Sequence, residues 1–230
     1  MFFEEIVDLG HPLYTGMPCH AAEVTAFWTV DSFAKTRRTS QGRMGLHNKM
    51  MLLSEHTGTH LDAPSHFDEH GLSVEQIPLE QLVLPGHLLD LTHKRPHEGI
   101  EPEDLRQAEA ASGQPVTPGH AVFVRTGQDV NWGTDNFFSE RPHVTSDAAQ
   151  WLVDKGISLF CTDLIAIDNP EEWWEPTHTA FLCGGVPMVQ QLNNLGRLVG
   201  RSFTFVVLPL AMRGGTASPV RPIALLHARS

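Results

Sequence analysis

The chain has 230 residues, of which 41% are hydrophobic and 19% are charged, and this composition is typical of a globular protein. A chain of this length can fold around one hydrophobic core, so we expect a single domain over residues 1–230, with two small domains as the alternative. The formal net charge of -11 repels phosphate backbones, and no run reaches the ~18 apolar residues of a membrane span, so we expect neither nucleic acid nor membrane as a partner.

Apolar runs rich in β-branched residues predict five buried strands. In chain order they cover residues 87–91, 121–124, 157–160, 203–208 and 223–226. Two segments between them carry the start and stop signals of helices. Residues 101–112 have Pro102 and acidic residues in the first turn and are followed by Gly113. Residues 145–155 begin with a Thr-Ser pair that can cap a helix and are followed by Gly156.

The order of these elements predicts the architecture. Strands that alternate with helices indicate an α/β fold with a mixed sheet, and their irregular spacing argues against a regular eight-fold barrel. Glycine and proline concentrate in four other stretches, which predicts long loops of the kind that build a site. These stretches are residues 10–18, 113–119, 127–142 and 209–222.

The N-terminal residues and the cysteines indicate a cytoplasmic protein. Residues 1–5 are not a positive segment followed by an apolar stretch, so we expect no cleaved secretory signal. Cys19, Cys161 and Cys183 are odd in number and lack CxxC spacing. This pattern argues against a disulfide framework and against a thiolate zinc site.

One short segment concentrates potential metal ligands. Residues 54–67 contain His56, His60, Asp62 and His66 in the pattern H-x3-H-x-D-x3-H, interrupted by glycine and proline. Two imidazoles and a carboxylate, without sulfur, suit zinc or manganese and leave coordination positions for water and substrate. The glycine and proline favour a ligand loop over a continuous helix. The competing interpretation, a histidine-rich surface loop, does not explain why four potential ligands are spaced so closely.

This segment is similar to the hallmark H-x-G-T-H-x-D-x-P-x-H of the cyclase and arylformamidase family, which includes kynurenine formamidase and isatin hydrolase. The similarity extends over nearly the whole chain. It is carried by residues 7–18, 71–79, 116–127, 156–168 and 208–221. The resemblance implies an α/β fold of the swivelling β/β/α type, assembled as a homodimer or homotetramer.

The resemblance also implies a distal half of the site. Family members have a histidine about two thirds along the chain and an acidic or amide residue twelve positions later, where this chain has His178 and Gln190. Glutamine resembles the isatin hydrolase-like branch with one manganese ion, whereas glutamate in the kynurenine formamidase-like branch can bridge two zinc ions. A neutral amide compensates a second dication poorly, so Gln190 favours one ion, Mn²⁺ or Zn²⁺.

Two alternatives stay open for this distal half. If the correspondence shifts by one residue, Gln191 takes the role of Gln190, and a strand over residues 187–192 would point the two side chains to opposite faces. Alternatively, His178 only caps a helix over residues 177–183 and Gln190 is an ordinary strand residue.

Aromatic residues are candidates for binding the substrate. The formamidase branch has a tryptophan in its opening loop where this chain has Met17, which disfavours kynurenine formamidase activity. Phe27 and Trp28, in a segment expected to be irregular, and Trp174, just before His178, are candidate substrate-binding residues. Ordinary packing is the competing interpretation for all three.

Together these features predict an enzyme, a metal-dependent hydrolase that acts on C–N bonds other than peptide bonds, with a small cyclic amide as substrate. The predicted metal ligands are His56, His60, Asp62 and Gln190. His66 is the predicted proton-transfer residue, and His178 is expected to orient the substrate or stabilise the intermediate. The alternatives are kynurenine formamidase, a lactone hydrolase, or a metal- or ligand-binding protein of the same fold without turnover.

Overall fold

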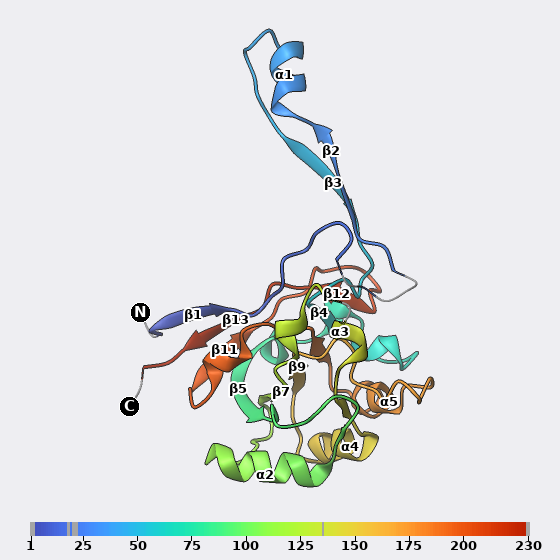
Figure 1. Cartoon of the computed structure of the whole chain (residues 1–230), viewed down its shortest axis with the longest axis vertical. Coiled ribbons are helices and arrows are strands. Elements are labelled where there is room, and N and C mark those ends of the chain that lie inside the picture. The colour runs from blue at the N-terminus through green and yellow to red at the C-terminus, as the bar shows by residue number, and fades with distance from the viewer. Residues whose placement is uncertain (1–2, 18, 20–22, 135, 229–230) are drawn as a thin grey trace.

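Nine strands form one curved, mixed sheet that runs through the body of the protein (Figure 1). The computed structural model describes residues 3–17, 19, 23–134 and 136–228. The strands, in spatial order, are β1 (Glu5–Asp8), β13 (Ile223–Leu226), β11 (Phe203–Val206), β5 (Val83–Asp90), β7 (Ala121–Arg125), β9 (Leu159–Thr162), β10 (Met188–Gln190), β4 (His60–Asp62) and β12 (Ala217–Pro219). The pairs from β5 through β10 are parallel and the others antiparallel, so the predicted mixed sheet is confirmed.

Three helices cover one face of this sheet. They are α2 (Pro102–Ser112), α4 (Ser146–Asp154) and α5 (Pro176–Cys183), seen below the sheet in Figure 1. The two helices predicted from capping signals are confirmed: the Thr145 hydroxyl accepts from the Ala148 amide at the start of α4, and Gly113 ends α2 with a φ of 71°. Because β7 is buried on both faces, its sequence Ala-Val-Phe-Val is continuously apolar rather than alternating.

Shorter elements connect the sheet and its helices. β6 (Gly99–Ile100) pairs with β8 (His143–Val144), and α3 (Asn136–Ser139) lies within the predicted loop 127–142. Short 3₁₀ turns occupy residues 64–66, 74–76, 79–81, 128–131 and 195–198. No helix in the described part of the chain combines the length and the hydropathy of a membrane span.

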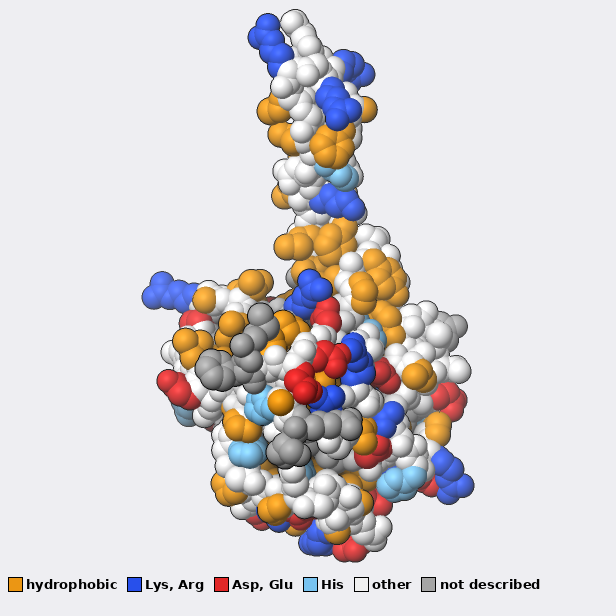
Figure 2. Space-filling view, turned by 90° about the vertical axis from the view of Figure 1, so that its left-hand side faces the viewer, with side chains coloured by type: hydrophobic (Ala, Val, Ile, Leu, Met, Phe, Trp, Pro, Cys, Tyr) orange, Lys and Arg blue, Asp and Glu red, His pale blue; other side chains and the backbone are white. Residues whose placement is uncertain are grey.

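A long arm projects from the body, and its shape was not expected. It consists of β2 (Ala26–Asp31), α1 (Phe33–Thr39) and β3 (Asn48–Leu52), and we call residues 26–52 the arm (Figures 1 and 2). The expectation of irregular structure around Phe27 and Trp28 is wrong, because β2 pairs antiparallel with β3. The partner strand, Asn-Lys-Met-Met-Leu, has no β-branched residue and therefore gave no strand signal.

A close approach between two strands gives a test of the packing. Gly86 of β5 pairs with Phe203 of β11, and a Cβ at Gly86 would lie 2.0 Å from Phe203 Cε2. We expect Gly86→Ala to lower the free energy of unfolding by about 1–3 kcal/mol, measured by urea denaturation. Gly10→Ala is the control, because its nearest neighbour would be 3.5 Å away. Equal stability of the two variants would contradict this packing.

Candidate metal centre

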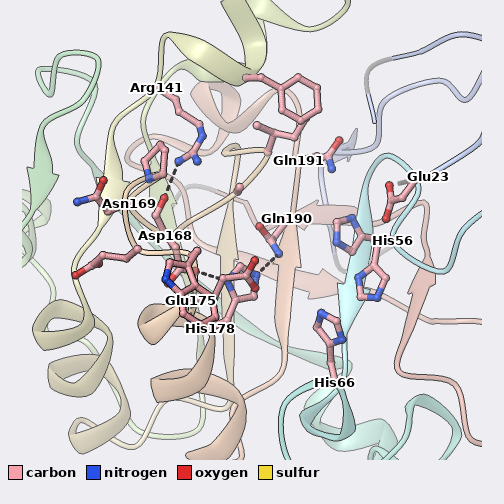
Figure 3. A pocket seen from close by; sticks show the side chains of 17 residues that line it. Glu23, His56, His66, Arg141, Asp168, Asn169, Glu175, His178, Gln190 and Gln191 are labelled. Atoms are coloured by element: carbon pink, nitrogen blue, oxygen red, sulfur yellow. Dashed lines mark hydrogen bonds and ion pairs between the residues drawn. The ribbon is translucent and has the colours of Figure 1, made fainter. Parts of the chain in front are cut away.

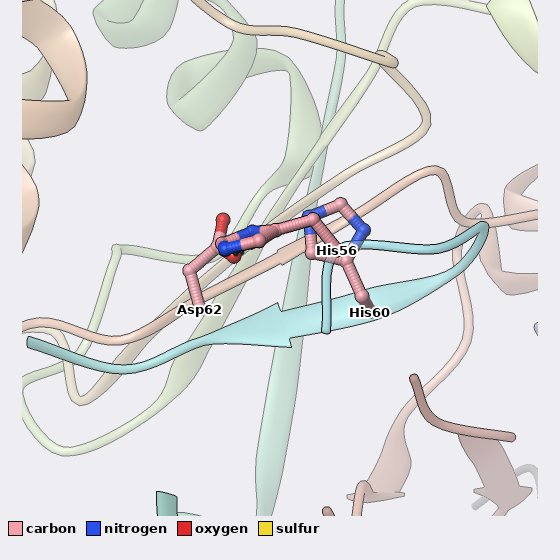
Figure 4. Close-up of side chains that lie close together, drawn as sticks. All are labelled: His56, His60 and Asp62. Atoms are coloured by element: carbon pink, nitrogen blue, oxygen red, sulfur yellow. Dashed lines mark ion pairs between the residues drawn. The ribbon is translucent and has the colours of Figure 1, made fainter. Parts of the chain in front are cut away.

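Strand β4 and the turn before it bring His56, His60 and Asp62 together (Figure 4). His60 and Asp62 are two residues apart on one strand, so their side chains share a face, while Leu61 points into the core on the other side. The potential ligand atoms of the three residues lie within 4.8 Å of one another. Asp62 Oδ1 is 2.8 Å from His56 Nδ1 and 3.3 Å from His60 Nε2.

The turn between the two histidines requires a glycine. Gly58 has a φ of +63°, and a Cβ there would lie 2.5 Å from Leu13 Cδ2 and 2.9 Å from Met17 Cε. The carbonyl of Gly58 lies 2.6 Å from His60 Nδ1. Because a carbonyl can only accept, Nδ1 carries a proton, and Nε2 is the ring nitrogen that faces Asp62. The turn therefore orients the ring of His60 in a form that can bind a metal.

The neighbouring strand adds Gln190 to the group. β10 pairs antiparallel with β4, and Gln190 lies directly opposite His60. The amide Nε2 of Gln190 donates to Asp62 Oδ2 at 2.7 Å and lies 3.1 Å from His178 Nε2. Since both hydrogens of the amide nitrogen then have acceptors, the carbonyl Oε1 is left as the available ligand atom.

Gln191 lines the same cavity as Gln190, so the expectation that the two side chains point to opposite faces is wrong. The reason is that β10 ends at Gln190 and Gln191 adopts a φ of +57°. Its backbone carbonyl accepts from the Thr59 hydroxyl at 2.7 Å. Gln190, whose amide contacts Asp62, is the better placed of the two as a distal ligand.

The donor set fits a divalent cation. Asp62 is only 1% exposed. Burial alone would raise the pKa of its carboxyl, but the imidazoles of His60 and His56 hold that pKa well below its usual value. Among the described residues, Gln190 Oε1 is buried without a hydrogen-bond donor, and Asp62 Oδ1 is buried against the imidazole nitrogens of His56 and His60. Two such oxygens beside two imidazoles form the N and O donor set that suits manganese or zinc.

His66 lies beside these residues on the 3₁₀ turn 64–66. The centroids of its ring and of the His56 ring are 4.3 Å apart. Burial lowers the pKa of His66 to about 4; Asp62 opposes this lowering and the neighbouring histidines add to it. His66 is therefore neutral at neutral pH and can accept a proton.

A cavity of about 470 Å³ lies over the group, with His56 and His66 on one wall, His178 and Asp168 on the other, and Gln190 between them (Figure 3). It is large enough for a small aromatic molecule. Phe27, Trp28 and Trp174, predicted to bind substrate, are not among its lining residues. β2 carries the first two away along the arm, and Trp174 is 53% exposed to solvent. The apolar lining comes instead from residues that include Phe138, Ile165 and Trp173.

Two acidic residues that the sequence did not indicate hold this site in place. Asp168 accepts from the Thr177 amide at 2.7 Å and from the ring Nδ1 of His178, so it caps α5 and leaves His178 Nε2 facing Gln190. Glu55, next to His56, accepts from the amide and hydroxyl of Thr216, both at 2.8 Å. These contacts tie the turn before β4 to residues near the other end of the chain.

Comparisons with known proteins identify the family of the chain. A family model described as "Putative cyclase" matches residues 7–169. Kynurenine formamidase of Salinibacter ruber is 29% identical over 202 residues, which cover 86% of this chain and 91% of that protein. An isatin hydrolase bound to the product analogue thioisatinate shares the fold, with a TM-score of 0.85 over 97% of this chain and 93% of its own, at 22% identity.

Isatin hydrolase A from Labrenzia aggregata, bound to benzyl benzoate, is 26% identical, with a TM-score of 0.84 over 97% of this chain and 94% of its own. The fold is therefore that of the cyclase-type hydrolases. The chain belongs to this cyclase family.

The geometry predicts which side chains are needed to bind metal. We expect His60→Ala and Asp62→Ala proteins to lose metal, because each change removes a donor atom from the group. His66→Ala should keep the metal content of the wild type, since His66 lies beside the donor set rather than in it. Elemental analysis by plasma mass spectrometry after dialysis measures this content. Wild-type metal content in both the His60→Ala and Asp62→Ala proteins would contradict the assignment.

Proposed function

We propose that the protein is a metal-dependent hydrolase that cleaves the C–N bond of a small cyclic amide, such as isatin. The observation that carries the proposal is the buried Asp62 held close to His56 and His60, two histidines that line a cavity of about 470 Å³. The similarity to an isatin hydrolase and to kynurenine formamidase supports the reaction class, since their names denote hydrolysis of a cyclic amide and of a formamide.

The proposed cofactor is one divalent ion, Mn²⁺ or Zn²⁺. Its proposed ligands are His56, His60, Asp62 and Gln190. Gln190 supports a single ion because a neutral amide offers no charge to compensate a second one. When bound, such an ion lowers the pKa of a water molecule toward neutrality and polarises a carbonyl oxygen as a Lewis acid.

The histidines outside this ligand set supply proton transfer and orientation. His66, held neutral by burial, accepts the proton of the water that attacks the amide carbon. It returns that proton to the ring nitrogen as the C–N bond breaks, so the products are an amine and a carboxylic acid, which releases its proton to solvent and becomes a carboxylate. His178, held at Nδ1 by Asp168, lines the cavity and orients the substrate.

Kynurenine formamidase activity is the second candidate, because the Salinibacter ruber relative carries that name and covers most of the chain. Two features favour the cyclic amide over the formamide. The first is the neutral side chain of Gln190. The second is Met17, which is 3% exposed and packs close to Gly58. Its flexible thioether takes the place of an aromatic side chain that would stack on a substrate.

A substrate panel tests the proposal directly. We expect the purified protein to open the ring of isatin, measured by the change in ultraviolet absorbance, and to lose this activity after chelation and regain it with added Mn²⁺ or Zn²⁺. N-formylkynurenine and a simple lactone complete the panel. Faster hydrolysis of N-formylkynurenine would establish the second candidate, and activity that chelation leaves unchanged would refute a metal-dependent reaction.

The role of His66 gives a further expectation. His66→Ala should lower kcat by about 10²- to 10⁴-fold, the usual contribution of general acid-base catalysis, while its metal content stays that of the wild type. His70→Ala is the matched control, because this nearby histidine is exposed. Full activity of His66→Ala would remove His66 from the mechanism.

A further inference from the structure

Arg141 places a positive charge in the wall of the cavity that His56 and His66 also line. It lies between α3 and β8, on the side of the cavity formed by Asp168 and His178 (Figure 3). Only 7% of Arg141 is exposed, and it is the one buried lysine or arginine among the described residues. Arginine is almost never buried without partners, because moving a charge out of water is costly. The surroundings of Arg141 therefore have to account for its burial.

The protein satisfies only part of this guanidinium. Nη1 of Arg141 donates to the backbone carbonyl of Asp168 at 3.0 Å and to that of Pro142 at 3.5 Å. Nε is buried without a hydrogen-bond partner. No carboxylate in the described part of the chain forms an ion pair with Arg141. Since a guanidinium has five N–H donors, Arg141 can still bind an acceptor that enters the cavity.

Asp168 is the acidic residue whose charge acts on Arg141, but its carboxylate has other partners. One oxygen accepts from the Thr177 amide and the other from the ring of His178. Burial lowers the pKa of the Arg141 guanidinium, and Asp168 opposes this lowering. An arginine side chain nevertheless stays charged at neutral pH. The cavity wall therefore carries a cation that the protein compensates only in part.

The other acidic residues at the cavity do not supply the missing anion. Glu23, Glu172 and Glu175 also line the cavity, but each is more exposed than Arg141, so water and salt screen their charges. Glu23 in addition accepts from the Ser54 hydroxyl at 3.1 Å. Because charges interact more strongly where water is excluded, Arg141 selects among ligands more strongly than these carboxylates do.

The chain holds Arg141 in a fixed position. Its carbonyl accepts from the His97 amide at 2.8 Å, and the following Pro142 restricts its backbone. The bond from Nη1 to the Asp168 carbonyl ties the guanidinium to the residue that also holds His178. A charged group that is fixed in this way loses little conformational entropy when a ligand binds.

We propose that Arg141 binds a carboxylate of the substrate, so that the preferred substrate is a cyclic amide with a carboxylate on its ring. This inference rests on the proposed function and adds an anionic group to the substrate considered there. A guanidinium and a carboxylate match in a bidentate geometry, and such a pair compensates the buried charge. The substrate then spans the cavity, with its carboxylate at Arg141 and its amide toward His56 and His66 on the other side.

A binding titration tests the role of Arg141 without relying on turnover. Indoles that carry a carboxylate at each position of the benzene ring are compared with the matching nitroindoles, in which a neutral group of similar shape replaces the carboxylate. Calorimetry should show that the wild type binds the best-placed carboxylate about 10- to 100-fold more tightly than its nitro counterpart. Arg141→Gln should remove this preference. Arg141→Lys, which keeps the charge but not the bidentate donors, should lower it at least about threefold.

Two controls separate this role from metal binding and from folding. Titrations before and after chelation distinguish Arg141 from a bound metal ion, which also binds carboxylates. Arg95→Gln, at an arginine whose side chain is 83% exposed, should keep the wild-type preference, and circular dichroism confirms that each variant is folded. No preference in the wild type, a preference that chelation abolishes, or the full wild-type preference in either folded Arg141 variant would overturn the proposal.

Hydrolysis of carboxylated isatins distinguishes this inference from the proposed function. The best-placed isatin carboxylate should have a KM about 10- to 100-fold below that of isatin, and Arg141→Gln should raise this KM more than it changes kcat. Hydrolysis of isatin with no gain from a carboxylate at any position would refute the role of Arg141 and leave the proposed function intact. Binding of indole carboxylates that depends on Arg141, without hydrolysis of any isatin, would support the carboxylate site and refute the proposed function.

Discussion

Asp62 places a negative charge where almost no water reaches it, and two imidazoles and an amide compensate that charge. A buried carboxylate without such neighbours would take up a proton. His56 and His60 hold the pKa of Asp62 low, and Gln190 donates to its second oxygen. The arrangement brings several ligand atoms close together. This proximity costs free energy when no cation is bound and stabilises the site when a cation is bound.

The sheet is the reason why these groups meet. β4 lies between β10 and β12, so the strand that carries His60 and Asp62 is fixed on both edges. The pairing with β10 places Gln190 opposite His60, and α5, which follows the parallel strand β9, delivers His178. Contributions from segments far apart in the chain converge on one cavity, which is how a rigid scaffold pre-organises a site.

The local part of the site could be predicted from the sequence, because its ligands lie within a few residues of one another around a required glycine. Three of the parallel strands, β5, β7 and β9, and two helices could also be predicted from apolar runs and caps. Contacts between distant segments carry no local pattern, which explains why Asp168 was not recognised as a partner of His178. The arm was missed because β3 lacks β-branched residues, and Gln191 was misjudged because a positive φ interrupts the strand alternation.

The central claim is that one divalent ion binds where His56, His60, Asp62 and Gln190 converge. Anomalous diffraction from crystals grown with Mn²⁺ or Zn²⁺, recorded at the absorption edge of the metal, tests this most directly. The account predicts one anomalous peak per chain, bounded by the ring nitrogens of His56 and His60 and by the Asp62 carboxylate. A second equal peak beside it would contradict the single-ion assignment, and no peak at this position would contradict the metal centre itself.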